Sequence, residues 1–494
     1  CPPLAISSQE IRPPWFRSQV DWLYPLLYTP PISPVRCRRT DLQHWIQKPV
    51  RPKQLKGANA YSGLQFSNRA ANMNGGLGGT IPMKFGIFYE HQLPRDWNIE
   101  SEHQLLKQSL SQIELADELG FDYAWEVEHH FLEEYSHSSA PEVFLAAASQ
   151  RTKNIRLGHG IVQMTTNHPA RVAEKVATLD LVSDGRVELG LGEGASVTEL
   201  HPFNLRFRDK RDVWEDAVRC TLPMFWNHGW EYEGEFFKFP LRAVVPKPLQ
   251  KPHPPLWVAC SQLDTIKYSA HRGMGSLCFK FVSLDAAKAW VHAYYNTFIH
   301  NLEKLADYQT NPNIAVVAGF MCAETDEEAW EKADGWTFFQ FALQLYNKEG
   351  PFEPGTMNFW ERYQEWKETP EGQKRTGSEL IGSPDTIRER LLELENSHVD
   401  QVILLNQAGK NTHEDICSSL ELFAREVMPE FKERHGEQEE WKRAVLAEEI
   451  ELEDIDTEPF NFAARLKPSQ PSTRDAKDMI SGVAGRPQAD SIQP

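Results

Sequence analysis

Between residue 83 and about residue 430, the hydrophobic and polar positions follow two alternating patterns. Short runs in which almost every residue is apolar are typical of strands buried on both faces, and longer segments repeat apolar residues at helical spacing. The pattern predicts strands at 84–89, 121–127, 155–162, 186–192, 255–259, 275–279, 314–321 and 401–405. It predicts helices at 102–119, 141–151, 170–182, 264–272, 284–306, 326–346 and 413–427.

Eight strands that alternate with helices imply parallel neighbours joined by right-handed crossovers. With this number of strands, a closed (β/α)8 TIM barrel is the best fit, and an open doubly wound sheet is the competitor. Two insertions interrupt the alternation: residues 193–209 with a hairpin-like segment at 228–240 after the fourth strand, and residues 350–378 before the last strand-helix units. Loops after barrel strands surround the active site, so both insertions are predicted to enclose a substrate.

The two ends of the chain differ in composition from this alternating region. Residues 1–82 are basic and rich in proline, without lasting periodicity, so we expect a disordered extension, with a targeting peptide as the alternative. Residues 83–435 are expected to form the barrel domain. Residues 436–494 are expected to form an acidic and then polar tail.

Charge and cysteine usage narrow the range of functions. The net charge of −18 over 494 residues argues against nucleic acid or an anionic membrane as the main partner. The sequence contains no run of 18 apolar residues, so no transmembrane helix is expected. The seven cysteines are dispersed, without C-x-x-C or zinc-binding spacing, which favours reduced thiols in the cytoplasm.

The most distinctive polar cluster is Glu128-His129-His130, at the end of the second predicted strand. Histidine gains and loses a proton near neutral pH, so this triplet suggests acid/base chemistry or metal binding. A strand-end histidine held by backbone hydrogen bonds is the alternative. Adjacent residues on an extended backbone point in opposite directions, so we do not expect His129 and His130 to share a metal.

Further motifs follow in a fixed order along the chain. They are Met83 with the first strand, the triplet, Asn167-His168-Pro169, Ser183-Asp184-Gly185-Arg186, Leu189-Gly190-Leu191-Gly192-Glu193-Gly194, Pro246-Lys247-Pro248 and Ile381-Gly382-Ser383-Pro384. In this order and spacing the chain resembles the bacterial luciferase-like monooxygenases, a flavin-dependent family with a TIM-barrel fold. The resemblance covers roughly residues 83–435.

The resemblance implies roles for residues at the predicted barrel mouth. In family members the first imidazole of the triplet lies beside the flavin, so His129 would serve as a base or a hydrogen-bond partner. Glu128 would orient an imidazole or touch the flavin edge. Relatives place a non-proline cis peptide under the central flavin ring, and the matching pair is Gly160-Ile161; the backbone as far as Gln163 would support the ring.

The flavin phosphate is expected at the ends of the fourth and fifth strands. Gly192 and Gly194 allow close approach to the backbone, but Glu193 stands where relatives often carry a phosphate-binding arginine. Its carboxylate would repel a phosphate, and the following insertion offers four replacements: Arg206, Arg208, Lys210 and Arg211. Ser261 and Thr265 match a loop that supplies hydroxyls to the phosphate at a helix N-terminus, with ordinary helix capping as the alternative.

The function implied is a monooxygenase that uses reduced FMN and O2 to oxygenate a small organic substrate. A separate NAD(P)H-flavin reductase would supply the reduced FMN, and a homodimer is expected by analogy. Aromatic residues of the insertions favour an apolar substrate: Phe203, Phe207, Trp230, Tyr232, Phe236 and Phe237.

Three other functions remain open. An F420-dependent hydride-transfer oxidoreductase would use the same barrel without O2. A non-catalytic flavin-binding protein is opposed by the intact Glu128-His129-His130 triplet. A metal-dependent barrel hydrolase is opposed by the first strand, after which the first histidine is His91.

Overall fold

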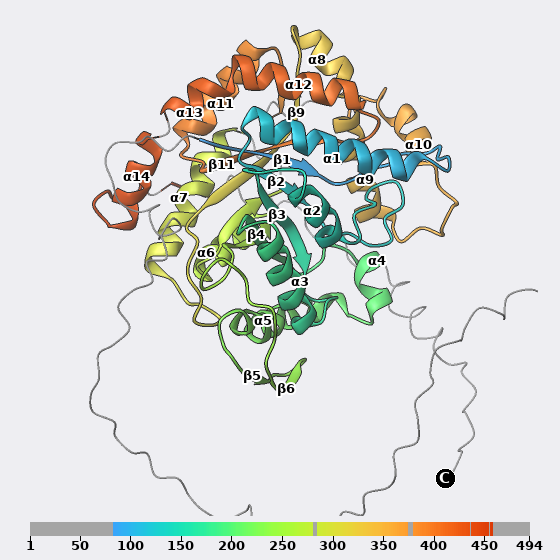
Figure 1. The fold of residues 1–494 in the computed structure, drawn as a ribbon. Helices are drawn as coiled ribbons and strands as arrows, with labels where there is room; N and C mark the ends of the chain where they lie inside the picture. Colours follow the sequence, from blue (N-terminus) through green and yellow to red (C-terminus); the bar gives the residue numbers. More distant parts are fainter. Residues whose placement is uncertain (1–82, 280–283, 374–378, 435, 454, 458–494) are drawn as a thin grey trace, which may run out of the picture. The chain divides into compact units, whose positions relative to one another are not determined.

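Eight parallel strands form a closed barrel in the computed structural model, which describes residues 83–279, 284–373, 379–434, 436–453 and 455–457 (Figure 1). The strands are β1 (Lys84–Tyr89), β2 (Tyr123–Glu126), β3 (Arg156–Gln163), β4 (Val187–Gly192), β7 (Leu256–Cys260), β8 (Gly275–Cys278), β9 (Ile314–Cys322) and β11 (Gln401–Gln407). The predicted (β/α)8 TIM barrel is confirmed. The predicted extension 1–82 lies outside the described residues.

The strand order explains how the barrel closes. β1 pairs with β2 on one side and with β11 on the other, and β8 pairs with β9 through Leu277 and Ala315. Nearly every residue in these strands is buried. Parallel strands covered by helices on one side and by the barrel core on the other read as continuous apolar runs, which is the pattern seen in the sequence.

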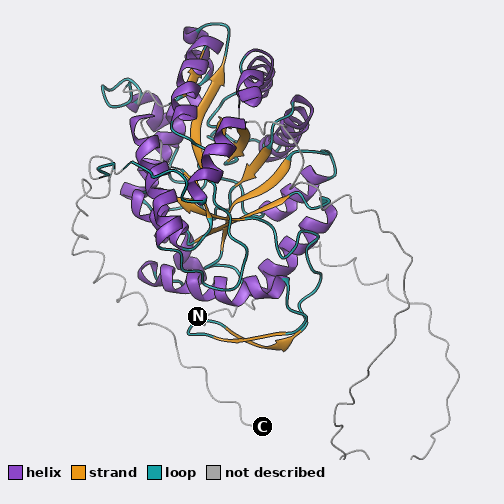
Figure 2. Cartoon of the chain, turned by 90° about the vertical axis from the view of Figure 1, so that its left-hand side faces the viewer, coloured by secondary structure: helices purple, strands orange, loops and turns teal. Residues whose placement is uncertain are grey.

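Helices surround the strands, as Figure 2 shows. They are α1 (Ser101–Leu119), α2 (Pro141–Ser149), α3 (Pro169–Val182), α5 (Lys210–Thr221), α6 (Leu263–His271), α7 (Leu284–His300), α11 (Pro384–Asn396) and α12 (His413–Glu426). Local sequence sets several of their ends. α1 stops at Gly120, which has a φ of 87°, and α3 opens with Pro169 in its first turn.

Two tryptophans fill the barrel interior. The rings of Trp125 on β2 and Trp257 on β7 meet edge to face with centroids 5.5 Å apart. Gly158 on β3 makes room for this packing, because a Cβ there would lie 2.2 Å from a ring carbon of Trp125. The barrel is therefore a packed core, and chemistry is left to its rim.

The insertion after β4 contains α4 (Val197–Leu200) and, after α5, an antiparallel hairpin of β5 (Trp230–Glu233) and β6 (Lys238–Arg242). Figure 2 shows the hairpin projecting at one edge of the barrel. Its aromatic residues serve local packing: Trp230 donates to the carbonyl of Cys220, and the Tyr232 hydroxyl donates to Asp216. Trp230 and Tyr232 therefore give no information about the substrate.

The second insertion lies between β9 and β11. It contains α8 (Asp326–Lys332), α9 (Asp334–Glu349), α10 (Phe359–Trp366) and β10 (Leu380–Gly382), which pairs with the end of β9. The prediction of one helix over 326–346 was wrong, because the chain breaks at Ala333. The break turns α9 so that Trp336 packs against Gly319 of β9, where a Cβ would meet the indole at 2.3 Å.

α13 (Met428–Arg434) closes the predicted barrel domain, and α14 (Gly436–Leu446) follows beyond its predicted end. Trp441 of α14 stacks on His398 with ring centroids 3.9 Å apart, and Lys442 lies 3.1 Å from the carboxylate of Asp400. The first part of the expected tail therefore packs on the barrel. Within the described residues, no helix has the length and apolar composition needed to span a membrane.

Candidate active site

The loop after β2 places His129 between two buried carboxylates. Its Nδ1 lies 2.8 Å from Glu199 Oε1, and its Nε2 lies 3.2 Å from Glu90 Oε1. Glu90 directly follows β1 and Glu199 belongs to α4, so both come from loops at the C-terminal ends of the strands. Active sites of (β/α)8 enzymes lie at this end of the barrel.

The charge state of this cluster follows from its geometry. Burial alone would lower the pKa of His129, but the two carboxylates outweigh it and hold that pKa well above its usual value. Burial would raise the pKa of Glu199, yet the contacts of this carboxylate with His129, Gln163 and Ser196 bring it below the usual value. The two carboxylates therefore favour the imidazolium form of His129, whose Nδ1–H donates to Glu199 and whose Nε2 forms an ion pair with Glu90. This state favours the hydrogen-bonding role over that of a base.

Glu128 makes a separate set of contacts. Its carboxylate lies 3.0 Å from His130 Nε2, accepts from Asn167 Nδ2 at 2.7 Å and accepts from the Gln163 backbone N–H at 2.9 Å. His129 and His130 thus point to different partners, as their adjacent positions predict. Glu128 orients His130 and the end of β3, whereas His129 is held by Glu90 and Glu199.

Gln163, at the end of β3, connects the two sets. Its Nε2 donates to the carbonyl of Glu128 at 2.9 Å and to Glu199 Oε1 at 2.7 Å. Its Oε1 is buried and has no hydrogen-bond partner among the described residues. The side chain therefore holds the cluster together and keeps an acceptor for a further donor.

The predicted flavin-supporting segment has a different backbone from the one expected. The Gly160-Ile161 peptide is not among the cis peptides of the described residues, so the expected cis bond is absent. Instead, the pairing of β3 with β4 shifts register between His159 and Val162. This bulge turns Ile161 over β4, where a Cβ on Gly192 would lie 2.3 Å from Ile161 Cδ1. Glycine at 192 is thus required by the packing of Ile161.

Glu193 is neutralised by two cations. The Arg211 guanidinium forms an ion pair with it, and Lys210 Nζ lies 3.6 Å from Glu193 Oε2. Lys210 also donates to the carbonyl of Gly194, which has a φ of 80°. Arg206 and Arg208, the other two candidates, instead approach Asp209. The three groups Glu193, Lys210 and Arg211 carry a formal charge of +1.

Arg211 connects this charged group to the helix that follows the predicted phosphate loop. Its guanidinium lies 4.0 Å from the ring centre of Tyr268 on α6. At the start of α6, the Thr265 hydroxyl donates to the carbonyl of Gln262 at 2.7 Å and accepts from its N–H, so it serves helix capping. Ser261 is exposed ahead of it. The helix end, Ser261 and Arg211 therefore remain candidates for an anion site.

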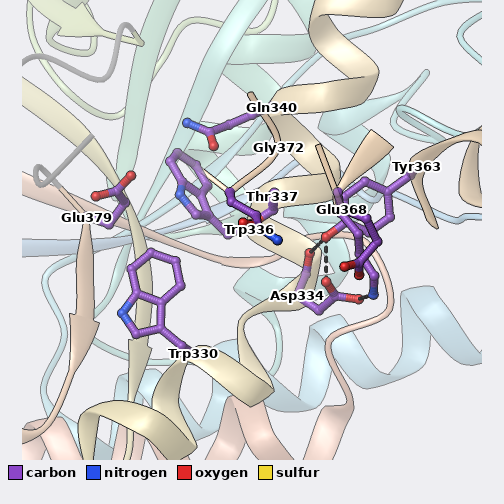
Figure 3. A pocket seen from close by; sticks show the side chains of 11 residues that line it. Trp330, Asp334, Trp336, Thr337, Gln340, Tyr363, Glu368, Gly372 and Glu379 are labelled. Atoms are coloured by element: carbon purple, nitrogen blue, oxygen red, sulfur yellow. Dashed lines mark hydrogen bonds and ion pairs between the residues drawn. The ribbon is translucent and has the colours of Figure 1, made fainter. Parts of the chain in front are cut away.

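A cavity of about 520 Å³ lies beside the second insertion (Figure 3). Its lining comprises Trp330, Asp334, Trp336, Thr337, Gln340, Tyr363, Lys367, Glu368, Gly372, Gln373 and Glu379. None of the residues predicted from the sequence is among them. The cavity and the His129 cluster are distinct features of the same barrel.

Fold and site together define a (β/α)8 enzyme with a histidine-carboxylate cluster at its C-terminal mouth. The sequence profile of the luciferase-like monooxygenases matches residues 83–401. The match covers well over half of the chain, and the chain belongs to this family. It is therefore an oxygenase of the flavin-dependent monooxygenase type.

Individual relatives agree with this assignment. The oxygenase component of the flavin-dependent trigonelline monooxygenase of Acinetobacter baylyi is 26% identical over 362 residues, which are 71% of this chain and 96% of that protein. Monooxygenase RslO1 from Streptomyces bottropensis has a TM-score of 0.58 at 24% identity, over 71% of this chain and 100% of that one. A third similar protein is the oxygenating constituent of 3,6-diketocamphane monooxygenase from Pseudomonas putida, whose structure was solved with FMN. Its TM-score is 0.57 at 19% identity, over 70% of this chain and 98% of that one. The two structural likenesses show the fold.

Proposed function

We propose that this chain is the oxygenase component of a two-component monooxygenase. It takes reduced FMN from a separate NAD(P)H-flavin reductase and uses O2 to oxygenate a small organic substrate. The name of the Acinetobacter baylyi relative, an oxygenase component, supports the division into two components. The observation that carries the proposal is the position of His129 between the buried carboxylates of Glu90 and Glu199, at the barrel mouth of a member of this family.

The residues present fit FMN. The phosphate would lie at the exposed Ser261 and the α6 N-terminus, because the first backbone N–H groups of a helix favour an anion. The net positive group of Glu193, Lys210 and Arg211 borders the same helix further along, at Tyr268. Glu193 therefore does not exclude the phosphate. The unpartnered Gln163 Oε1 would accept from a donor on the ring edge.

When bound, reduced flavin supplies the electrons that activate O2, which no side chain can do. The protein contributes a positive charge at the barrel mouth and holds the side chain that carries it in place. His129, as an imidazolium, places a positive charge at the mouth, and Glu90 and Glu199 fix its ring through both nitrogens. The Nδ1 proton of His129 is held by Glu199 Oε1 at 2.8 Å, and Nε2 faces Glu90 Oε1 at 3.2 Å as an ion pair.

The test is a calorimetric titration of the full chain with oxidised FMN, anaerobically reduced FMN, riboflavin and F420. We expect reduced FMN to bind and Arg211→Gln to weaken it about tenfold or more, because a hydrogen bond to a charged group contributes about 1.5–3 kcal/mol. Riboflavin, which lacks the phosphate, should be unaffected. The matched control is Arg206→Gln, since Arg206 is exposed and pairs with Asp209.

The alternative cofactor gives a different result in the same experiment. F420-dependent enzymes share this fold, with a TM-score of 0.53 at 15% identity in one case. Binding of F420 without binding of reduced FMN would refute the proposed monooxygenase. With FMN bound, reductase-coupled O2 consumption would distinguish an enzyme from a non-catalytic flavin carrier.

A further inference from the structure

Two phenylalanine rings lie exposed at the barrel mouth, next to the histidine cluster. Phe131 directly follows the Glu128-His129-His130 triplet and is 56% exposed, and Phe203, at the end of the short 3-10 helix η1 (His201–Phe203), is 40% exposed. Their ring centroids lie 5.7 Å apart. Single exposed apolar residues are common on protein surfaces, whereas exposed apolar residues in contact with one another are typical of binding sites.

The backbone of Phe131 is strained. Its φ is 64°, in the left-handed region that favours glycine and that a bulky aromatic residue rarely adopts. Strain of this kind clusters at sites where a ligand is held. Burial does not offset it here, because more than half of the residue is exposed. The conformation of Phe131 therefore points to a role for its ring other than folding.

A third ring fixes the position of the pair. The His130 imidazole lies edge to face against Phe203, with centroids 5.2 Å apart, and its centroid lies 5.8 Å from that of Phe131. The imidazole is itself held by Glu128, whose Oε1 lies 3.0 Å from His130 Nε2. The two phenylalanines therefore pack against a side chain that is anchored to the barrel.

The two loops that carry these rings also meet at the histidine cluster. His129 of the β2 loop pairs with Glu199 of α4 at 2.8 Å, and Glu199 precedes Phe203 by only four residues. The side chain of His129 is 19% exposed, so it is open to the solvent at the mouth. The exposed rings and the ion pair thus belong to the same junction of two loops, and a molecule bound against the rings lies at this junction.

Exposed phenyl rings favour one class of small molecule. The face of such a ring carries negative potential and its edge carries positive potential, so two rings attract each other in offset-stacked or edge-to-face arrangements. This attraction adds to the gain from burying apolar area. A saturated ring of the same size buries a similar area without it. The two phenylalanines therefore distinguish a planar aromatic compound from its saturated analogue.

We propose that Phe131 and Phe203 form an aromatic edge of the substrate site and select a substrate that carries a planar aromatic ring. The inference rests on the proposed function, in which the substrate reacts at the barrel mouth. The substrate ring packs against both phenylalanines, and His130, held by Glu128, keeps Phe203 in position for this contact.

The test uses two neutral probes with the same carbon skeleton: 2-naphthol, which is planar and aromatic, and decahydro-2-naphthol, which is saturated. Each is titrated calorimetrically into the flavin-free full chain. We expect 2-naphthol to bind about tenfold more tightly, because two ring–ring contacts favour it alone. Nonspecific burial would favour the saturated probe, which is the more apolar of the two. Because no flavin is present, failure of this test leaves the FMN titration, and with it the proposed function, unaffected.

Variants locate the contact. Phe131→Leu and Phe203→Leu keep an apolar side chain but remove the ring, so each should reduce the preference for 2-naphthol about threefold. The matched control is Phe207→Leu, because Phe207 belongs to the same insertion and is 45% exposed, but its ring lies 4.5 Å from the ammonium group of Lys210. This control should leave the preference unchanged. Equal binding of the two probes by wild type, a preference that both leucine variants at 131 and 203 retain, or an equal loss in the control would overturn the inference.

Phe131→Gly separates binding from folding. Glycine adopts a φ of 64° without strain, so this variant should lose the contribution of Phe131 to the preference while its melting temperature does not fall. A melting temperature that falls together with the preference would assign Phe131 to folding and overturn its role in selecting the substrate.

Discussion

Replacing Glu199 by glutamine removes one of the two charges that hold His129 and leaves the size of the side chain unchanged. At 2.8 Å the imidazolium and the carboxylate attract each other by about 6 kcal/mol at an effective dielectric constant of 20, before the cost of desolvation. Loss of one partner of a buried ion pair costs about 3–5 kcal/mol. Glutamine keeps an acceptor for His129, so we expect Glu199→Gln to reduce the free energy of unfolding by about 2–4 kcal/mol at pH 7.

The pH dependence identifies the cause of this loss. The folded pKa of His129 is raised above its unfolded value of 6.5, so its contribution is complete below pH 6.5 and is lost as the pH rises through the folded pKa. The folded pKa of Glu199 is lowered from 4.5, so its contribution is present above pH 4.5 and is lost as the pH falls through the folded pKa. The difference between wild type and variant should therefore be largest between these limits.

Urea unfolding of both proteins from pH 4 to pH 9 measures this difference. The control is Glu102→Gln, which removes the partner of His137 at 2.9 Å but from an exposed carboxylate. Surface pairs of this kind contribute about 0–1 kcal/mol, so the control should be nearly neutral. A stability loss in Glu199→Gln that equals the control, or one that stays constant over the whole pH range, would refute the charged-histidine reasoning.

Three further expectations follow from packing and burial. Gly192→Ala should reduce the free energy of unfolding by about 1–3 kcal/mol in urea, because the new methyl group would meet Ile161 Cδ1 at 2.3 Å. Gly160→Ala is the control and should be nearly neutral, because a Cβ there meets only ordinary contacts from 3.6 Å. Equal losses of stability in the two variants would contradict this packing. Burial lowers the pKa of His159 to about 4, and both its ring nitrogens lack hydrogen-bond partners among the described residues, so the folded state loses stability as the pH falls below 6.5. His159→Leu removes this loss, so the stability of the variant relative to wild type should be about 2 kcal/mol greater at pH 5 than at pH 8. A difference that does not change with pH would exclude this cause. Thr265→Val should lower the melting temperature by removing a helix cap worth about 1 kcal/mol, and an unchanged value would mean that the cap contributes nothing.

The fold could be predicted because the relevant information is local. Strands buried on both faces produce apolar runs, and Gly120 and Pro169 mark helix ends within one or two residues. The break at Ala333 could not be predicted, because the helical spacing continues through it and the cause is the packing of Trp336 on Gly319.

The site was predictable only in part, because its partners come from distant segments. The residue His129 stood out in the sequence, but its partners Glu90 and Glu199 are 39 and 70 positions away and carry no motif of their own. Glu90 at the end of the first strand was the one available signal, since strand ends meet at the barrel mouth. The pairing of Glu193 with Arg211 depends on where the insertion after β4 folds back, which spacing alone does not determine.

The short strand β10 gives the second insertion a closed attachment to the barrel. The chain leaves the wall after Cys322 and returns with Gly382 paired to that same residue. Everything between these positions, including the walls of the cavity, thus begins and ends on one pair of strands. The insertion is nevertheless coupled to the rim, because Phe339 of α9 stacks on Tyr135 and Tyr135 meets the ring of His129, so a change in α9 reaches the histidine through two ring contacts.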